Sequence, residues 1–163
     1  MQEHACGHHH DQDSGLPVGE RLRQAEILCT GRGTRLTAQR RVVLEALLTA
    51  RRALGAYDLI EQVSRATGKR TAPITIYRAL EFLQEMGLAH RIESRNAFLA
   101  CHGGHRPHAL TVFMICDCCG QVAEADAPGL EAELDRLATG HGFRAQSRVI
   151  EMAGRCSTCN EGP

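Results

Sequence analysis

The chain has 163 residues, 43% of them hydrophobic, and its 19 Lys and Arg residues balance its 19 Asp and Glu residues. This length suits one domain or two small ones with a hydrophobic core. No apolar run reaches the roughly eighteen residues of a membrane span, and the polar N-terminus lacks the apolar segment of a secretory signal. We therefore expect a cytoplasmic protein with no membrane partner.

The net charge of zero is the sum of three segments that differ in net charge. Residues 1–19 have a net charge of −3, residues 20–100 carry 14 Lys and Arg against 8 Asp and Glu, and residues 101–163 carry 5 against 8. A basic segment joined to an acidic one indicates that only the basic segment meets a polyanion. A solvated, arginine-rich surface would give the same pattern.

Four helical patterns follow a polar, His-rich stretch, residues 1–19, which we interpret as a disordered tail. Apolar residues recur at helical spacing in residues 20–29, 38–50, 56–67 and 73–86. Thr37 can cap the second helix, and Pro73 fits the first turn of the fourth. Gly68 and Gly87 are placed to end the third and fourth helices.

Alternating patterns at residues 88–94 and 96–101 predict two short strands joined by a turn. Helices followed by a hairpin are the layout of a winged helix-turn-helix, which we assign to residues 20–100. Residues 101–109 are rich in Gly, Pro and His, and the charge changes sign there. We therefore predict that they form a hinge or linker between two domains.

A second, small α+β domain is predicted for residues 110–163. Its strands are expected at residues 110–115, 121–125 and 143–152, and its helix at residues 128–140. So short a domain has a thin core, and we expect it to need a metal, a partner subunit or both. The predicted fold class is therefore α+β throughout.

Two Cys-x-x-Cys pairs stand in this second domain: Cys116 with Cys119, and Cys156 with Cys159. Such a pair lets two thiolates from one turn reach one tetrahedral ion, and four thiolates leave no open position for a substrate. The 36 intervening residues contain a helix and a strand that can bring the pairs together. We predict a structural Zn²⁺ site, with free cysteines, a disulfide or an iron–sulfur cluster as alternatives, and interpret Cys118 as a non-ligand.

The fourth helix of the winged domain would lie in the major groove of DNA. Arg78 is the best candidate for reading a base, because its guanidinium can bond bidentately to guanine. Thr75 and Tyr77 could bond phosphates or bases, although Tyr77 could instead pack inward, and Tyr57 could touch a base or sugar. The phosphate candidates, each alternatively a solubilising surface charge, are Arg35, Arg40, Arg41, Lys69 and Arg70.

Seven motifs, in order and with compatible spacing, resemble the ferric/zinc uptake regulator (Fur) superfamily and most closely its zinc uptake regulator (Zur) branch. They are "RLTAQR", "AYDLIEQV", "PITIYRALEFL", "GLAHRIES", "CHGGHRPH", "FMICDCCGQVAE" and "GRCSTC". The resemblance implies a dimeric, metal-dependent repressor with an N-terminal winged helix and a C-terminal dimerisation domain. It also implies that the four paired cysteines hold structural zinc.

The resemblance further implies a regulatory metal site at the hinge, and thus two Zn²⁺ per subunit, one structural and one regulatory. The implied ligands are His90, Cys101, a linker histidine and Glu124, where we favour His108 over His105 and His102. A thiolate among imidazoles favours Zn²⁺ over Fe²⁺ or Mn²⁺. Alternatively, His90 is an ordinary polar strand residue and Glu124 a solvated strand end.

The expected function is that of a zinc-responsive repressor, a binding protein rather than an enzyme. It would bind double-stranded operator DNA as a zinc-loaded homodimer and shut off zinc-uptake genes. Within the family, the alternative is a regulator that senses iron, manganese or peroxide. Outside it, the alternatives are a zinc enzyme built on the His, Cys and Glu set, and a zinc-storage or chaperone protein.

Overall fold

A computed structural model describes residues 16–50, 52–101, 110–145 and 148–160 of the chain. The predicted His-rich tail lies almost wholly outside these ranges. The described residues divide into two compact units, one of residues 16–101 and one of residues 110–160. Within the described ranges, no helix has the length and apolar character needed to cross a membrane.

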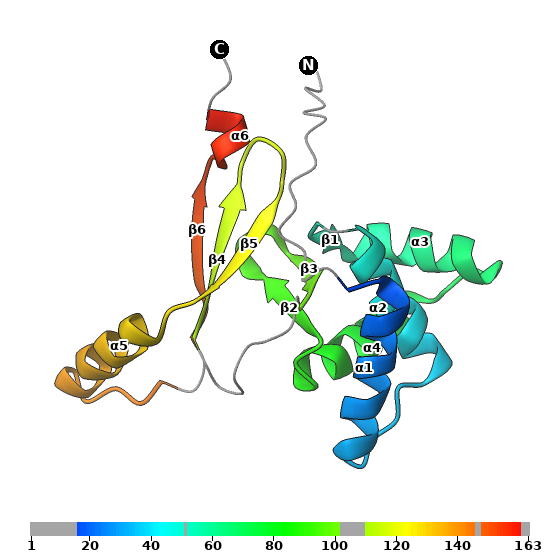
Figure 1. Cartoon of the computed structure of the whole chain (residues 1–163), viewed down its shortest axis with the longest axis horizontal. Helices are drawn as coiled ribbons and strands as arrows, with labels where there is room; N and C mark the ends of the chain where they lie inside the picture. The colour runs from blue at the N-terminus through cyan, green and yellow to red at the C-terminus, as the bar shows by residue number, and fades with distance from the viewer. Residues whose placement is uncertain (1–15, 51, 102–109, 146–147, 161–163) are drawn as a thin grey trace. The chain divides into compact units, whose positions relative to one another are not determined.

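The first unit contains four α-helices and a small sheet (Figure 1). The helices lie within two residues of the predicted ranges at either end: α1 Val18–Gly31, α2 Ala38–Ala50, α3 Ala56–Thr67 and α4 Pro73–Glu85. Their buried side chains include the apolar positions that the periodicity placed inward, such as Val43, Leu59 and Leu80. The four helix predictions are therefore confirmed.

Local signals set the ends of these helices. The Thr37 hydroxyl caps α2 by accepting a 3.5 Å hydrogen bond from the Arg40 N–H. Gly68 ends α3 with a φ of 66°, and Gly87 follows α4 with a φ of 69°. Glycine adopts these left-handed conformations without steric cost. Pro73 occupies the first turn of α4, where its missing N–H costs nothing.

The wing is a three-stranded antiparallel sheet in the order β1-β3-β2. Strands β2, Ala89–Ile92, and β3, Ala97–Ala100, form the predicted hairpin. The two strands are joined by a 3-10 turn, Glu93–Arg95, and by Asn96 at a φ of 45°. The third strand, β1, Leu54–Gly55, was not predicted, because a strand of two residues carries no alternating pattern.

The second unit has a three-stranded sheet in the order β5-β4-β6. Strand β4 pairs antiparallel with β5 and parallel with β6. Two helices complete the unit, and Figure 1 shows α6 and α5 at opposite ends of the sheet. Its elements are β4 Thr111–Cys116, β5 Val122–Asp126, α5 Pro128–Gly140, β6 Ile150–Gly154 and α6 Ser157–Asn160.

One strand of this unit was predicted with the wrong bounds, and one short helix was not predicted. The last strand was predicted at residues 143–152, but β6 begins at Ile150 and continues to Gly154. Phe143 and Arg144 are exposed and have no strand pairing, since β6 pairs with β4 only from Ile150 onward. The short helix α6 was not expected either, because its four residues include only one strongly apolar side chain.

The second unit leaves much apolar surface uncovered. No described side chain of α5 is buried, and Leu137 is 60% exposed. Phe143 is 68% exposed and Met152 56% exposed. The buried residues of this unit are few, namely Leu110, Val112, Phe113, Ile115, Cys116 and Val122. A core this thin agrees with the expectation that the unit needs further stabilisation.

Candidate metal centres and nucleic-acid interface

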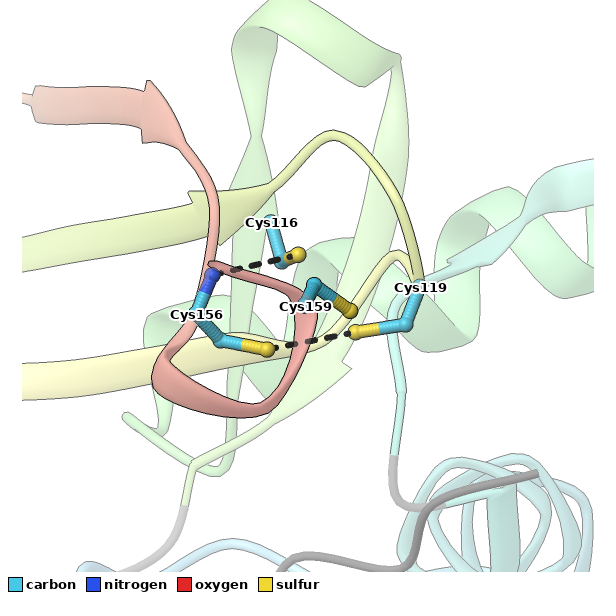
Figure 2. Close-up of side chains that lie close together, drawn as sticks. All are labelled: Cys116, Cys119, Cys156 and Cys159. Carbon is cyan, nitrogen blue, oxygen red and sulfur yellow. Dashed lines mark hydrogen bonds between the residues drawn. The ribbon is translucent and has the colours of Figure 1, made fainter. Parts of the chain in front are cut away.

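Four cysteine side chains converge at one end of the second unit (Figure 2). Cys116 ends β4, Cys119 lies in the following turn, Cys156 follows β6 and Cys159 lies in α6. Their sulfur atoms all lie within 4.8 Å of one another. The Sγ atoms of Cys119 and Cys156 are 3.8 Å apart. These are the four cysteines that the spacing of the two pairs selected.

The parallel pairing of β4 with β6 explains how two pairs separated by 36 intervening residues meet. This pairing sets Cys116 of β4 opposite Gly154 of β6, so the two strands end on the same side of the sheet. The Asp117 N–H donates a 2.8 Å hydrogen bond to the Gly154 carbonyl, which ties the two turns together. Gly120, at a φ of 73°, lets the first turn fold back, and its N–H donates a hydrogen bond to the Cys116 carbonyl.

The pKa of Cys116 is shifted in one direction and the pKa values of Cys119 and Cys159 in the other. Burial opposes ionisation of Cys116, but hydrogen bonds from the backbone N–H groups of Cys119, Cys156 and Cys118 outweigh it and lower its pKa to about 6. Burial raises the pKa of Cys119, and burial with the neighbouring thiols raises the pKa of Cys159. A cation that binds four sulfurs relieves this crowding by displacing protons. The donor set fits Zn²⁺, which prefers tetrahedral thiolate sites.

Cys118 is exposed and lies outside this group of four sulfurs. It stands between Cys116 and Cys119 in a turn whose backbone already wraps the site. Cys29, by contrast, is fully buried on α1, and burial raises the pKa of its thiol. Neither residue joins the cysteine cluster in the structure.

His90 and Cys101 lie next to each other in the winged domain. His90 is in β2 opposite Leu99, and the Cys101 N–H donates a 3.0 Å hydrogen bond to the Leu88 carbonyl. Candidate ligand atoms of His90 and Cys101 lie within 4.8 Å of each other, and both side chains are half-buried. The Arg21 guanidinium donates to the Cys101 carbonyl and fixes it from the side of α1. An imidazole and a thiol are thus held at metal-binding distance.

The other implied regulatory ligands are Glu124, which belongs to the second unit, and a linker histidine. Glu124 is a half-buried residue of β5, opposite Phe113 of β4 in the second unit. His102, His105 and His108 lie outside the described residues. The full regulatory ligand set therefore stays a prediction.

Four of the DNA-binding candidates lie on helices α3 and α4. Tyr57, at the start of α3, is 85% exposed; Tyr77, on α4, is 47% exposed, so it does not pack inward. Arg78 is exposed and Thr75 half-buried on the same helix. The opposite face of α4 is buried in the core through Ile76, Leu80 and Leu83.

Arg40 has two contacts within the winged domain. Its guanidinium carbon lies 3.5 Å from the centroid of the Phe82 ring, and its Nη1 donates a 2.8 Å hydrogen bond to the Arg35 carbonyl. A cation over an aromatic face is stabilising, more so when it is partly desolvated. These contacts give Arg40 a role in holding α2 against α4, beside its predicted contact with DNA.

Replacing Arg40 with alanine should lower the free energy of unfolding by about 1 kcal/mol, because the cation–π contact and the hydrogen bond are both lost. Urea denaturation of the zinc-loaded protein measures the change. Arg52→Ala is a suitable control, since Arg52 is exposed. Equal midpoints for Arg40→Ala and Arg52→Ala would show that the contacts contribute nothing to stability.

A sequence model of the ferric uptake regulator family matches residues 31–153. The chain belongs to the ferric uptake regulator family. The zinc uptake regulation protein of Escherichia coli K12 is 41% identical over 142 residues, which cover 87% of this chain and 82% of that protein. The resemblance that the seven motifs indicated is thereby confirmed.

Two solved structures match the fold of this chain over most of its length. A zinc uptake regulator complexed with zinc and DNA matches with a TM-score of 0.85 at 40% identity, covering 90% of this chain and 97% of that chain. The crystal structure of holo XcZur matches with a TM-score of 0.81 at 35% identity, covering 90% of this chain and 100% of that chain. The predicted fold class, a winged helix followed by a small α+β domain, is confirmed.

One exposed apolar residue of α4 was not among the candidates identified from the sequence. Ile74, in the first turn of α4, is 58% exposed although its side chain is large and apolar. The helical pattern assigned the inward face of α4 to other residues and left Ile74 without a role. It lies one helical turn before Arg78 on α4.

Proposed function

We propose that the chain is a zinc-responsive transcriptional repressor that binds operator DNA as a zinc-loaded homodimer and controls zinc-uptake genes. The observation that carries the proposal is the close match in fold and sequence to a zinc uptake regulator complexed with zinc and DNA. The protein acts by binding and not by catalysis. A match at 40% identity over 90% of the chain supports a shared mode of action.

The structural zinc is assigned to Cys116, Cys119, Cys156 and Cys159. Four sulfur atoms within 4.8 Å of one another suit a closed site with no position left for a substrate. Such a site joins the turn after β4 to helix α6. It contributes folding free energy to a unit whose apolar core is small.

The regulatory zinc is assigned to His90, Cys101, His108 and Glu124. The juxtaposition of the His90 imidazole and the Cys101 thiol supports this, because a mixed N and S ligand set favours Zn²⁺ over Fe²⁺ and Mn²⁺. Since the ligands belong to both units of the chain, one bound ion would restrict how the units can be oriented. Zinc would then select the conformation that binds DNA.

The homodimer is assigned to the second unit. Leu137, Phe143 and Met152 are each more than half exposed, and a soluble chain rarely leaves so much apolar surface in contact with water. Burying these side chains against a second copy would stabilise both copies. The dimer also suits a palindromic operator, whose half-sites mirror the two-fold symmetry of the protein.

Arg78 is assigned as the reader of a base, and Thr75, Tyr77 and Tyr57 as further contacts to DNA. Arg78→Ala should weaken operator binding by about 1–3 kcal/mol and relax specificity at one position of each half-site. Arg70→Ala is the contrast, because loss of a phosphate contact weakens binding to all sequences and lowers the salt dependence. Binding isotherms on operator variants at several salt concentrations separate the two. Uniform weakening by Arg78→Ala would make Arg78 a phosphate contact.

The proposal is tested by selecting duplexes from a random-sequence pool with the zinc-loaded protein. We expect enrichment of a palindromic sequence that the protein binds with zinc and releases after chelation. Binding should weaken steeply with salt, as contacts to phosphates require. Enrichment of no sequence, with or without zinc, would favour a storage protein over a repressor.

A further inference from the structure

The exposed face of α4 divides into two halves of different chemistry. Ile74, Arg78, Glu81 and Glu85 follow one another at helical spacing, and all four are exposed. The N-terminal half of this stripe is apolar and cationic, and the C-terminal half is acidic. Phosphates repel the two glutamates, so the half that carries Ile74 and Arg78 is the one suited to the DNA groove.

Ile74 is a large apolar side chain that lies mostly in contact with water. It is 58% exposed, whereas Ile76, two residues later, is fully buried in the core. A single exposed apolar residue needs no explanation on an ordinary surface. This one lies one helical turn from the guanidinium assigned to a guanine, so the same surface would be covered whenever Arg78 reaches a base.

The distance between Ile74 and Arg78 along the helix limits which base Ile74 could contact. One helical turn advances about 5.4 Å, and successive base pairs are about 3.4 Å apart, so Ile74 would face a base one or two pairs from the guanine. The C5-methyl of thymine is the apolar group that the major-groove edges of the base pairs present. An isoleucine side chain therefore matches a thymine and no other unmodified base.

We propose that Ile74 is a specificity-determining residue that contacts the C5-methyl group of a thymine one or two base pairs from the guanine read by Arg78. This rests on the proposed function, since it requires α4 to enter the major groove. The contact would reject cytosine at that position. It would also bind thymine more tightly than uracil, which differs only by the methyl group.

The test uses the duplex selected from the random pool, with each thymine replaced in turn by uracil. At one thymine of each half-site, uracil should weaken binding of the full zinc-loaded protein about fourfold, as expected for one methyl group. Ile74→Ala should bind the thymine and uracil duplexes equally, and Ile74→Val should keep the preference. Ile27→Ala is the matched control, because Ile27 is 72% exposed on α1.

Several results would overturn the proposal. They are equal binding of every uracil duplex by the wild type, an unchanged thymine preference in Ile74→Ala, and a selected half-site without thymine near its guanine. Loss of the dimer in Ile74→Ala, measured by sedimentation, would assign the residue to a protein contact instead. Sequence-specific, zinc-dependent binding without a thymine preference overturns only the role of Ile74. No such binding at all overturns the proposed function together with it.

Discussion

Replacing Cys101 with serine should abolish zinc-dependent operator binding while leaving the structural zinc and the dimer in place. A serine hydroxyl is a poor zinc ligand, and Cys101 supplies the only thiolate in the proposed regulatory set. The side chain lies at the end of the wing hairpin, half-buried beside His90, so the substitution leaves the core intact. We expect the variant to hold one zinc per subunit and the wild type two.

The control for Cys101→Ser is Cys118→Ser, which removes an exposed thiol outside both sets of ligands. Zinc content by atomic absorption, molecular mass in solution and operator affinity at buffered zinc should be measured together. Cys118→Ser should behave as wild type in all three. A Cys101→Ser variant with two zinc ions per subunit and a normal zinc response would remove Cys101 from the regulatory site.

Replacing Cys159 with serine should unfold most of the second unit. A four-thiolate zinc site is worth about 10–16 kcal/mol of apparent binding free energy in small domains. That exceeds what the few buried side chains of this unit can supply without the metal. The expected result is loss of the structural zinc, of the dimer and of cooperative unfolding for residues 110–160, with the winged domain still folded.

Hydrogen exchange followed by mass spectrometry measures the unfolding of each unit separately. Amides of β4, β5 and β6 should lose protection in Cys159→Ser, while those of α2 and α4 keep it. Treatment of the wild type with a strong chelator should give the same pattern. Unchanged protection of β4 and β6 in a zinc-free variant would show that the apolar core is sufficient without the metal.

The winged domain could be predicted from sequence because its signals are local. Amphipathic periodicity located each helix, and Thr37, Pro73 and Gly87 marked ends that the structure reproduces. The hairpin followed from alternating residues interrupted by a turn. What was missed there is β1, whose two residues are ordered only by pairing with Phe98 and Ala97 of β3.

The second unit depends on pairings that the sequence does not display. The convergence of the four cysteines requires β4 and β6 to run parallel, and that pairing joins residues about 40 positions apart. Cysteine spacing identified which sulfurs meet but not the strand order that brings them together. The start of β6 was missed for the same reason, since that pairing begins at Ile150.

Candidate site residues could be predicted from the sequence where their residue type alone indicates their chemistry. Cysteine and histidine are few in number, so their spacing is informative. Arginine is common in this chain, and residue type alone did not separate Arg40, which packs over Phe82, from the exposed Arg78. Ile74 carries no polar group, so only its exposure on α4 distinguishes it from a core residue.

A buffered metal titration tests most directly whether zinc is the metal that regulates operator binding. The protein is stripped of its regulatory metal under reducing conditions and titrated with Zn²⁺, Fe²⁺ or Mn²⁺ while operator binding is followed by fluorescence anisotropy. We expect Zn²⁺ to restore binding at far lower free concentration than the other two ions, since the ligand set includes a thiolate. Restoration by Fe²⁺ or Mn²⁺ but not by Zn²⁺ would contradict the assignment.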